Sequence, residues 1–348
     1  MVEVSQLNVS MRLLKLISEI DEFKGRWNAE NLSENEPLKH LKKVSTIESI
    51  GSSNRIEGNK LSNIDVETVL KNIESKSFRS RDEEEVAGYA ELISTIYDNY
   101  QYITFNESYI KQLHKILLQN VSKDVRHCGE YKKISNAVAA FDEQGKTLGI
   151  VFDTATPFDT PRMMEELVNW VNKAFEEKFL HPLIIIGIFT VHFLAIHPFQ
   201  DGNGRLSRAL TTLLLLKNGY TYVCYSSIES IIEASKNSYY RALRHTQENI
   251  WNNNVDYNPW LEFFISSLHK QKLHLEEKIT SIEKNADLSE RAIVVLNLFT
   301  ENKKLTSKEI TQKTGFNIET VRKILQKLLQ RRCIKKFGTT KTRYYQPT

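Results

Sequence analysis

The stretch His197-Pro-Phe-Gln-Asp-Gly-Asn-Gly-Arg-Leu-Ser-Arg208 decides how the chain is organised, because an apolar segment flanks it on each side. Residues 183–196 precede it and residues 209–216 follow it. An apolar run as long as residues 183–196 is typical of a buried helix. The stretch is therefore predicted to be a loop between two buried helices, and the second helix is expected to begin near Gly202.

The residue types of this loop suit an anionic ligand. A helix N-terminus has free backbone N–H groups and a partial positive charge, so it attracts phosphate. Gly202 and Gly204 have no Cβ and allow an anion to approach the backbone, while Asn203 can hydrogen-bond locally to shape the loop. Arg205 and Arg208 are three residues apart on one helix face and offer forked donors to phosphate oxygens.

Two further residues of the loop suit a transfer reaction. His197 titrates near neutral pH, so its imidazole can accept a proton from an attacking hydroxyl. Asp201 offers carboxylate oxygens to a divalent cation that bridges phosphates. The loop therefore predicts a nucleoside polyphosphate site. The alternative is a capped loop between core helices whose arginines are merely solvated.

The stretch resembles the motif of the Fic family, HxFx(D/E)GNGRxxR, at every defined position. The resemblance implies a protein adenylyltransferase, an enzyme that transfers AMP from ATP, with Mg²⁺, to a Ser, Thr or Tyr hydroxyl of a protein. It implies that His197 is the general base and that Asp201 holds the Mg²⁺. Relatives that phosphorylate their targets carry a lysine where this chain has Gly204, so Gly204 favours AMP transfer; other nucleotide donors stay open.

The same resemblance assigns the phosphate-binding residues. The backbone from Gly202 to Gly204, with Asn203 and Arg205, would bind the α- and β-phosphates of ATP. Arg208 would reach the γ-phosphate.

A second motif lies far upstream. Ser53-Asn54-Arg55-Ile56-Glu57-Gly58 resembles the inhibitory motif of the same family, (S/T)xxxE(G/N), in the class II arrangement, where it precedes the catalytic motif. A bidentate pair between Glu57 and Arg208 would occupy the guanidinium that otherwise binds the γ-phosphate. The Glu57 carboxylate would also repel that phosphate. Ser53 is expected on the same helix face as Glu57. The alternative is that Glu57 is an ordinary helix-end residue before a Gly58 C-cap.

Some family members use this glutamate to align a water that removes AMP. The sequence does not decide whether Glu57 does so.

The composition predicts a mainly α-helical protein. The chain has 348 residues, with only 13 Gly and 7 Pro, and it is long enough for more than one domain. Its three cysteines have no metal-like spacing, and no basic-then-apolar signal begins the chain, so a reduced cytoplasmic location without membrane association is expected. Residues 3–27 are expected to form the first helix, and Asn63 to cap a helix over residues 64–73.

The expected fold is a Fic-type helical bundle with a β-hairpin flap, followed by a small winged-helix domain. Residues 1–100 are expected to form a helical region with the inhibitory helix, and residues 101–260 the Fic catalytic core. Residues 261–287 are expected to form a linking helix, and residues 288–348 the winged helix.

A non-helical stretch near residues 129–157 is expected to form the flap. Gly129-Glu130-Tyr131-Lys132 resembles the family signature that precedes this hairpin, and Asp142-Glu143-Gln144-Gly145 is a predicted turn. The resemblance implies that the flap clamps the target protein by strand addition; a plain surface hairpin is the alternative. Tyr239 and Tyr240 lie on a helix that resembles one closing the nucleotide pocket, where either ring could pack on adenine, or else in the core.

The C-terminal segment is basic. Residues 288–348 contain 14 Lys and Arg against 4 Asp and Glu, whereas the rest of the chain contains 33 against 39. A third helix rich in Arg322, Lys323 and Lys327 and a following strand pair predict a winged helix that binds DNA or a protein. This leaves a second interpretation of the whole chain, a DNA-binding regulator whose core senses nucleotide. A homodimer is another candidate assembly, which the sequence does not decide.

Overall fold

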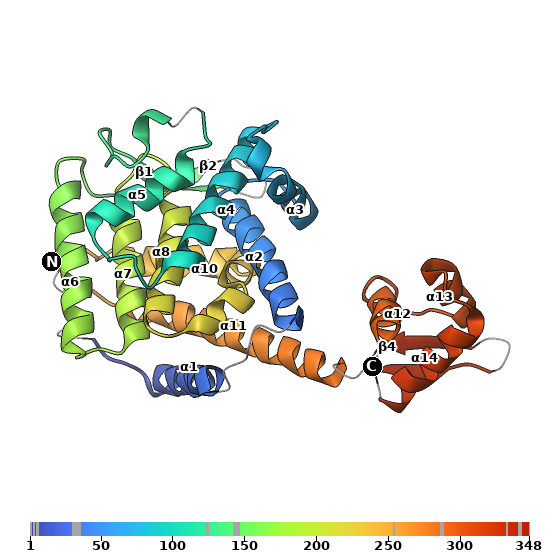
Figure 1. The fold of residues 1–348 in the computed structure, drawn as a ribbon. Coiled ribbons are helices and arrows are strands. Elements are labelled where there is room, and N and C mark those ends of the chain that lie inside the picture. The colour runs from blue at the N-terminus through green and yellow to red at the C-terminus, as the bar shows by residue number, and fades with distance from the viewer. Residues whose placement is uncertain are drawn as a thin grey trace. The chain divides into compact units, whose positions relative to one another are not determined.

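The computed structural model describes all residues except 1, 3, 5, 6, 30–35, 123–124, 142–146, 253–254, 286–288, 332, 340–342 and 348. The chain divides into two compact units, residues 1–275 and 276–348. The structure is mainly α-helical, as the sequence predicts (Figure 1). No helix among the described residues is long and apolar enough to cross a membrane.

The first unit is a helical bundle with one hairpin. Its helices are α1 (Met11–Ala29), α2 (Glu36–Ile56), α3 (Asn63–Lys71), α4 (Arg81–Asn99), α5 (Glu107–Leu118), α6 (Thr160–Glu177), α7 (Pro182–Ile196), α8 (Asn203–Lys217), α9 (Ile228–Ala234), α10 (Lys236–Gln247) and α11 (Asn258–Asn285), the last of which continues beyond residue 275. The short 3₁₀ turns are η1 (Ile73–Ser75), η2 (Val125–His127) and η3 (Thr221–Tyr225).

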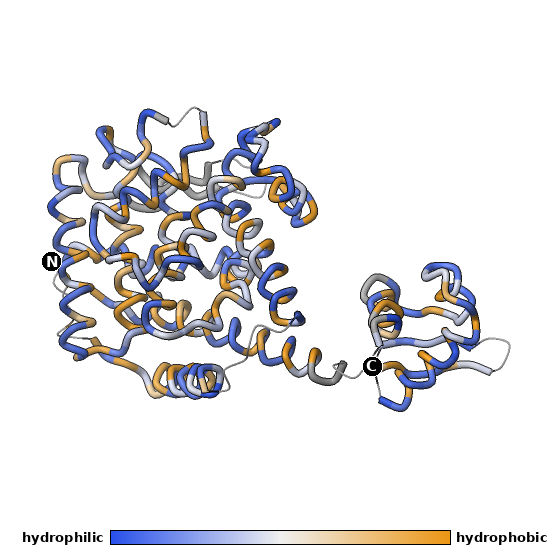
Figure 2. Tube along the Cα trace, viewed as in Figure 1, coloured by the Kyte–Doolittle hydropathy of each residue, from blue (hydrophilic) through white to orange (hydrophobic). Residues whose placement is uncertain are grey.

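Helix α7 forms the centre of this unit. Every residue from Leu183 to Ile196 is buried, as expected for a helix that is apolar on all sides, and the trace of α7 is mostly orange in Figure 2. Its Gly187 lets α11 approach closely, since a Cβ there would lie 2.7 Å from the Leu261 side chain. The indole of Trp260 donates to the Gly187 carbonyl oxygen at 2.7 Å. The predicted buried helix before the loop is therefore present.

Helix α2 carries the upstream motif to its C-terminal end. It packs against α9 and α4, and its last two turns bury small polar residues, among them Ser49, Ser52 and Ser53. The chain then turns at Gly58, whose φ of 100° favours glycine. The next helix, α3, has its N-cap at Ser62, which forms a capping box with Asp65.

The hairpin pairs β1 (Ala137–Phe141) with β2 (Thr147–Asp153) in an antiparallel register, with irregularities on either side of Ala139 and Ala140. It lies in the stretch where a flap is expected. The predicted turn at residues 142–145 lies outside the described residues.

The second unit has a core of its own. It contains α12 (Glu290–Glu301), α13 (Ser307–Thr314), α14 (Ile318–Gln330) and a hairpin of β3 (Ile334–Phe337) and β4 (Tyr344–Pro347). Val295, Ile310, Val321 and Tyr345 are among the buried side chains that join these elements. Thr306 caps α13 with a capping box to Glu309. Three helices followed by a hairpin are the elements that the sequence predicts for a winged helix.

Candidate active site

The site begins where α7 ends. His197 caps α7 in the left-handed conformation, with φ 52° and ψ 59°, which is uncommon for a residue with a side chain. Its Nδ1 lies 3.3 Å from the carbonyl oxygen of Leu194. A carbonyl can only accept, so this contact places the ring proton on Nδ1 and leaves the lone pair on Nε2. Burial lowers the pKa of His197 to about 4, so the imidazole is neutral at pH 7.

Lys132 holds the backbone on both sides of His197. Its Nζ donates to the Ile196 carbonyl oxygen at 2.9 Å, and its N–H donates to the Pro198 carbonyl oxygen at 2.8 Å. The same Nζ donates to Asn136 and Thr154, which flank the hairpin. Burial lowers the pKa of Lys132 to about 8. Lys132 thus ties the loop between α7 and α8 to the hairpin, a role that its place in the flap signature did not indicate.

The loop between α7 and α8 is shaped by Asn203. Its side-chain amide accepts from the N–H of Phe199 at 2.9 Å and donates to the carbonyl oxygen of the same residue at 2.7 Å. Both ends of the amide are thereby engaged within the loop. Gly202, with φ 78°, precedes α8, which begins at Asn203. The expectation that Asn203 shapes the loop agrees with this geometry.

His114 of α5 packs against the loop between α7 and α8. Its ring stacks on Phe199 with centroids 3.8 Å apart, and its Nδ1 accepts from the N–H of Gly129 at 2.9 Å. The proton is therefore on Nε2, which lies 3.0 Å from the carbonyl oxygen of Asp201 and donates to it. Burial lowers the pKa of His114 to about 4 and keeps it neutral. No motif marks this residue, and the sequence alone does not indicate it as part of the site.

Arg208 of α8 is held by the end of α2. Its Nη2 lies 2.8 Å from Oε1 of Glu57 and 2.8 Å from the Ser53 carbonyl oxygen, and its Nε donates to Oγ of Ser53 at 2.9 Å. Arg208 is 4% exposed, and the Glu57 side chain 35%. Burial alone would lower the pKa of Arg208, because it disfavours the charged guanidinium. The negative charge of Glu57 contributes most to the opposite effect, which is the stronger, so the pKa of Arg208 is raised.

The two predicted motifs thus meet at this contact, since Ser53 and Glu57 lie 155 and 151 positions before Arg208 in the sequence. Gly58 does not take part in it. Its role is to end α2 with a positive φ just beyond Glu57.

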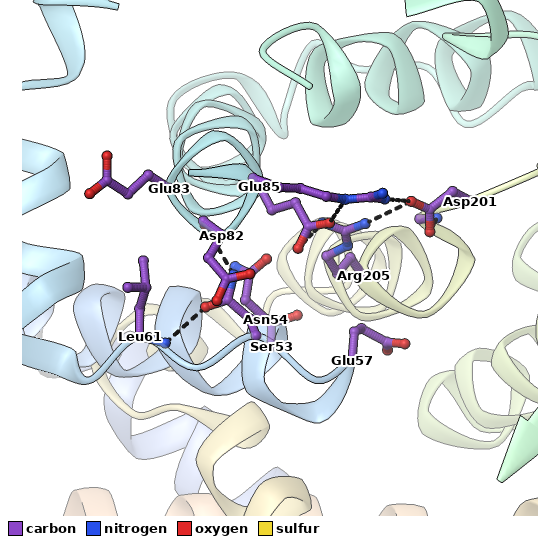
Figure 3. Close-up of polar contacts among 12 residues, drawn as sticks. Ser53, Asn54, Glu57, Leu61, Asp82, Glu83, Glu85, Asp201 and Arg205 are labelled. Atoms are coloured by element: carbon purple, nitrogen blue, oxygen red, sulfur yellow. Dashed lines mark hydrogen bonds and ion pairs between the residues drawn. The ribbon is translucent and has the colours of Figure 1, made fainter. Parts of the chain in front are cut away.

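Arg205 and Asp201 form a separate charged group with the first turn of α4. Nη2 of Arg81 lies 2.9 Å from Oδ2 of Asp201, and Nε of Arg81 lies 2.9 Å from Oε1 of Glu85. Arg205 completes a ring, at 3.5 Å from both Asp201 and Glu85. Figure 3 shows Glu85 of α4 beside Asp201 and Arg205, with Glu57 on the other side of α8.

Several buried arginine nitrogens in this region form no hydrogen bond with the described residues, although Nη1 of Arg205 lies 3.5 Å from Oε2 of Glu85 in an ion pair. Nε and Nη1 of Arg205 and Nη1 of Arg208 are buried without a hydrogen-bond partner among the residues the structure describes. A buried donor left without an acceptor is costly, so these three atoms indicate a site for an anionic ligand. Both arginines belong to the first two turns of α8, whose N-terminal dipole also favours an anion.

The two tyrosines of α10 lie near this group but differ in their packing. Tyr239 is 3% exposed and packs against Trp260 and Phe263, with ring centroids 5.8 Å away in each case. Burial raises the pKa of Tyr239 to about 12 while the charge of Arg208 opposes this shift. Tyr240 is half-buried, and the centroids of the Tyr239 and Tyr240 rings lie 5.1 Å apart. Tyr239 is therefore a core residue beside Arg208, and Tyr240 is the more exposed of the two rings.

Comparison with known proteins gives the same family as the motif. Residues 104–215 match the model of the Fic/DOC family. Among curated relatives, the protein adenylyltransferase Fic of Drosophila mojavensis is 27% identical over 258 residues, which are 73% of this chain and 46% of the relative. A probable protein adenylyltransferase of Aquifex aeolicus is 30% identical over 114 residues, 33% of this chain and 35% of the relative. The chain spans less than half the length of these relatives.

Solved structures show the same fold. A Fic family protein of Desulfovibrio desulfuricans has a TM-score of 0.60 at 21% identity, over 98% of this chain and 97% of its own. A Fic domain containing signaling protein of Bacteroides thetaiotaomicron has a TM-score of 0.61 at 25% identity, over 75% of this chain and 97% of its own. Residues 104–215 therefore resemble a Fic/DOC domain, and the segment from His197 to Arg208 lies within the matched residues.

Proposed function

We propose that the protein transfers AMP from ATP to a Ser, Thr or Tyr hydroxyl of a protein, and that Glu57 holds it in an inactive state. The observation that carries this proposal is the buried contact of Arg208 with Glu57 and Ser53 at 2.8 to 2.9 Å. The Glu57 carboxylate is paired with the Arg208 guanidinium, to which the motif assigns the γ-phosphate. The curated relatives, which are named as protein adenylyltransferases, support the same activity.

The ATP phosphates would bind at the N-terminus of α8. Nε and Nη1 of Arg205 and Nη1 of Arg208 supply buried donors for them. Gly204 leaves room for a phosphate oxygen beside the backbone, in the space that Oε1 of Glu57 approaches in this structure. Tyr240 is the better placed of the two tyrosines to pack on adenine, because one face of Tyr239 is already buried against Trp260 and Phe263.

The residues present fit a bound Mg²⁺. This ion is commonly held by one or two carboxylates together with substrate phosphates. Oδ1 of Asp201 accepts from the N–H of Gly202 at 2.6 Å, so a cation would bind at Oδ2, which is paired with Arg81 at 2.9 Å in this structure. No group of three or more His, Cys, Asp or Glu among the described residues could hold a metal by itself. Asp201 would hold Mg²⁺ together with the phosphates, and the ion would neutralise phosphate charge during transfer.

His197 would accept the proton of the attacking hydroxyl. Its neutral ring, with the proton on Nδ1, presents the Nε2 lone pair to the substrate. The hydroxyl oxygen forms a bond to the α-phosphorus, the bond from that phosphorus to the bridging oxygen breaks, and pyrophosphate leaves. The proton goes to Nε2. Lys132 fixes the backbone of His197 on both sides, which keeps the ring oriented for this step.

The hairpin is the candidate docking site for the target protein. β1 and β2 pair only with each other in the described residues, so each has a free edge for an added strand. Backbone pairing at such an edge would place many different hydroxyl-bearing segments without requiring one sequence. Lys132, Asn136 and Thr154 connect the base of the hairpin to the loop of His197.

The experiment that tests the proposal identifies the transferred group. Glu57→Gly protein is incubated with Mg²⁺ and ATP labelled on the α- or the γ-phosphate, with the Glu57→Gly/His197→Ala variant as control. The proposal predicts protein-bound label from the α-position only, which is lost in the control. Label from the γ-position, or undiminished label in the control, would refute it.

A second function is favoured by one observation in the C-terminal unit. Arg322 and Lys323 are exposed on α14, the third helix, which is the helix that winged-helix proteins place in the DNA major groove. We propose that this unit binds DNA as a separate activity. Binding to duplex DNA that weakens with salt and is lost in Arg322→Glu/Lys323→Glu would support it. No difference between this variant and the unchanged protein would refute it.

A further inference from the structure

We propose that Arg81 is a second inhibitory contact, which holds Asp201 in the place of the divalent cation that accompanies ATP. The proposal rests on the proposed AMP transfer and adds to it a regulatory contact on the metal side of the site. Glu57 would block the γ-phosphate at Arg208, and Arg81 would block the cation at Asp201.

The contact involves the one oxygen of Asp201 that a cation would use. Oδ1 accepts from the N–H of Gly202 at 2.6 Å and shapes the start of α8. Oδ2 receives Nη2 of Arg81 at 2.9 Å and Nη2 of Arg205 at 3.5 Å. A guanidinium at 2.9 Å repels a metal ion from the same oxygen, because both are cations. Arg81 and the cation therefore compete.

The position of Arg81 in its helix is unusual for a cation. It is the first residue of α4, next to Ser80 as N-cap, where the helix dipole disfavours positive charge. Glu85, which is 13% exposed, accepts from Nε of Arg81 at 2.9 Å and aims the guanidinium at Asp201. Glu85 also lies 3.5 Å from Arg205. Glu85 therefore contacts Arg205 directly and reaches Asp201 only through Arg81.

The two inhibitory contacts are linked through the segment after Glu57. The N–H of Lys60 donates to Oδ2 of Asp82 at 3.0 Å, and the side chain of Asn59 donates to the carbonyl oxygen of Asp82, also at 3.0 Å. Asp82 follows Arg81 directly in sequence, and Figure 3 shows it between the end of α2 and Glu85. A shift of the end of α2 that frees Arg208 would therefore be transmitted to the first turn of α4.

The test measures how much Mg²⁺ strengthens ATP binding. The titrated protein is Glu57→Gly/His197→Ala, in which Arg208 has lost its Glu57 partner and the proposed general base for AMP transfer is absent. ATP binding to it is measured calorimetrically in Mg²⁺ and in EDTA. The ratio of the two Kd values is compared with the ratio after Arg81→Gln. Arg79→Gln is the matched control, because Arg79 is an exposed arginine two residues earlier. The ratio cancels the general effect of removing one positive charge near the phosphates.

We expect Arg81→Gln to increase this ratio between about twofold and fivefold, the range for a partly exposed ion pair, and Arg79→Gln to leave it unchanged. An unchanged or smaller ratio in Arg81→Gln would overturn the proposal, since Arg81 would then position Asp201 for the cation or bind phosphate itself. If Glu57→Gly transfers the α-label while Arg81→Gln has no effect, only this inference fails. If ATP binds in neither medium, the proposed AMP transfer fails with it.

Discussion

A Cβ placed on Gly204 would lie 2.1 Å from Oε1 of Glu57. Glu57 therefore rests directly on the backbone at the start of α8, in addition to its contact with Arg208 at 2.8 Å. The absence of a side chain at residue 204 lets the Glu57 carboxylate reach the Arg208 guanidinium. The same space would admit a phosphate oxygen once Glu57 leaves, so Gly204 serves both states of the site.

Gly204→Ala should destabilise the protein only while Glu57 is present. The new methyl group displaces the Glu57 carboxylate and breaks its pair with Arg208, which we expect to lower the free energy of unfolding by about 1–2 kcal/mol. In the Glu57→Gly background there is no carboxylate to displace, and Ala favours the helix over Gly by about 0.5–1 kcal/mol. Denaturant unfolding of the four proteins measures this coupling. Equal effects of Gly204→Ala in the two backgrounds would contradict it.

The two tyrosines of α10 should respond differently to truncation. Tyr239→Ala removes a buried ring from contact with Trp260 and Phe263, and we expect a loss of about 3–5 kcal/mol of stability. Tyr240→Ala should cost less stability and instead weaken ATP binding, because Tyr240 is the more exposed of the two rings. Thermal unfolding and ATP titration of both variants separate these effects. Unchanged ATP affinity in Tyr240→Ala would remove this residue from the nucleotide site.

Stability should fall as the pH falls from 7 towards 4, because buried histidines stay neutral in the folded state. Burial lowers the pKa of His192 to about 3, from an ordinary value of 6.5. Below pH 6.5 the unfolded chain binds a proton that the folded one does not, so stability that is present above that pH is lost as pH falls. His114 and His197, with pKa values lowered to about 4, act in the same direction.

Replacing His192 isolates its share of this pH dependence. His192→Gln should reduce the slope of unfolding free energy against pH by at most about 1.4 kcal/mol per pH unit between pH 6 and pH 4. Urea unfolding at several pH values measures the slope, and His245→Gln, an exposed position on α10, is the control. If both variants keep the slope of the unchanged protein, the buried histidine is not its source.

The helices around the catalytic loop were predictable because their signals are local. Residues 183–196 are apolar without interruption, and the loop that follows concentrates Gly, Asn and Arg in one short segment. The family motif then indicated that Glu57 and Arg208 would meet. By contrast, the contacts of His114 and Arg81 with residue 201 join positions 87 and 120 apart in sequence and involve common residue types. Sequence patterns carry no signal for such pairs.

Helix starts were less predictable, because neighbouring residues compete for the same cap. The expectation of Asn63 as N-cap was wrong: Ser62 takes the position, since its hydroxyl and Asp65 can form a capping box. The expected start of the first helix at residue 3 was also wrong. The described residues 7–10 precede α1, and the Ser10 hydroxyl accepts from the N–H of Leu13 at 3.2 Å, so α1 begins at Met11.

The most direct test of the account is the rate at which α-phosphate label enters the protein in Glu57→Gly and in the unchanged protein, side by side. Glu57→Gln is the matched control, which keeps the size of the side chain but weakens its pair with Arg208. We expect a rate about tenfold higher in Glu57→Gly, because a partly buried charged hydrogen bond of about 1.5 kcal/mol is lost, and an intermediate rate in Glu57→Gln. Equal rates in all three proteins would contradict the claim that Glu57 inhibits transfer through Arg208.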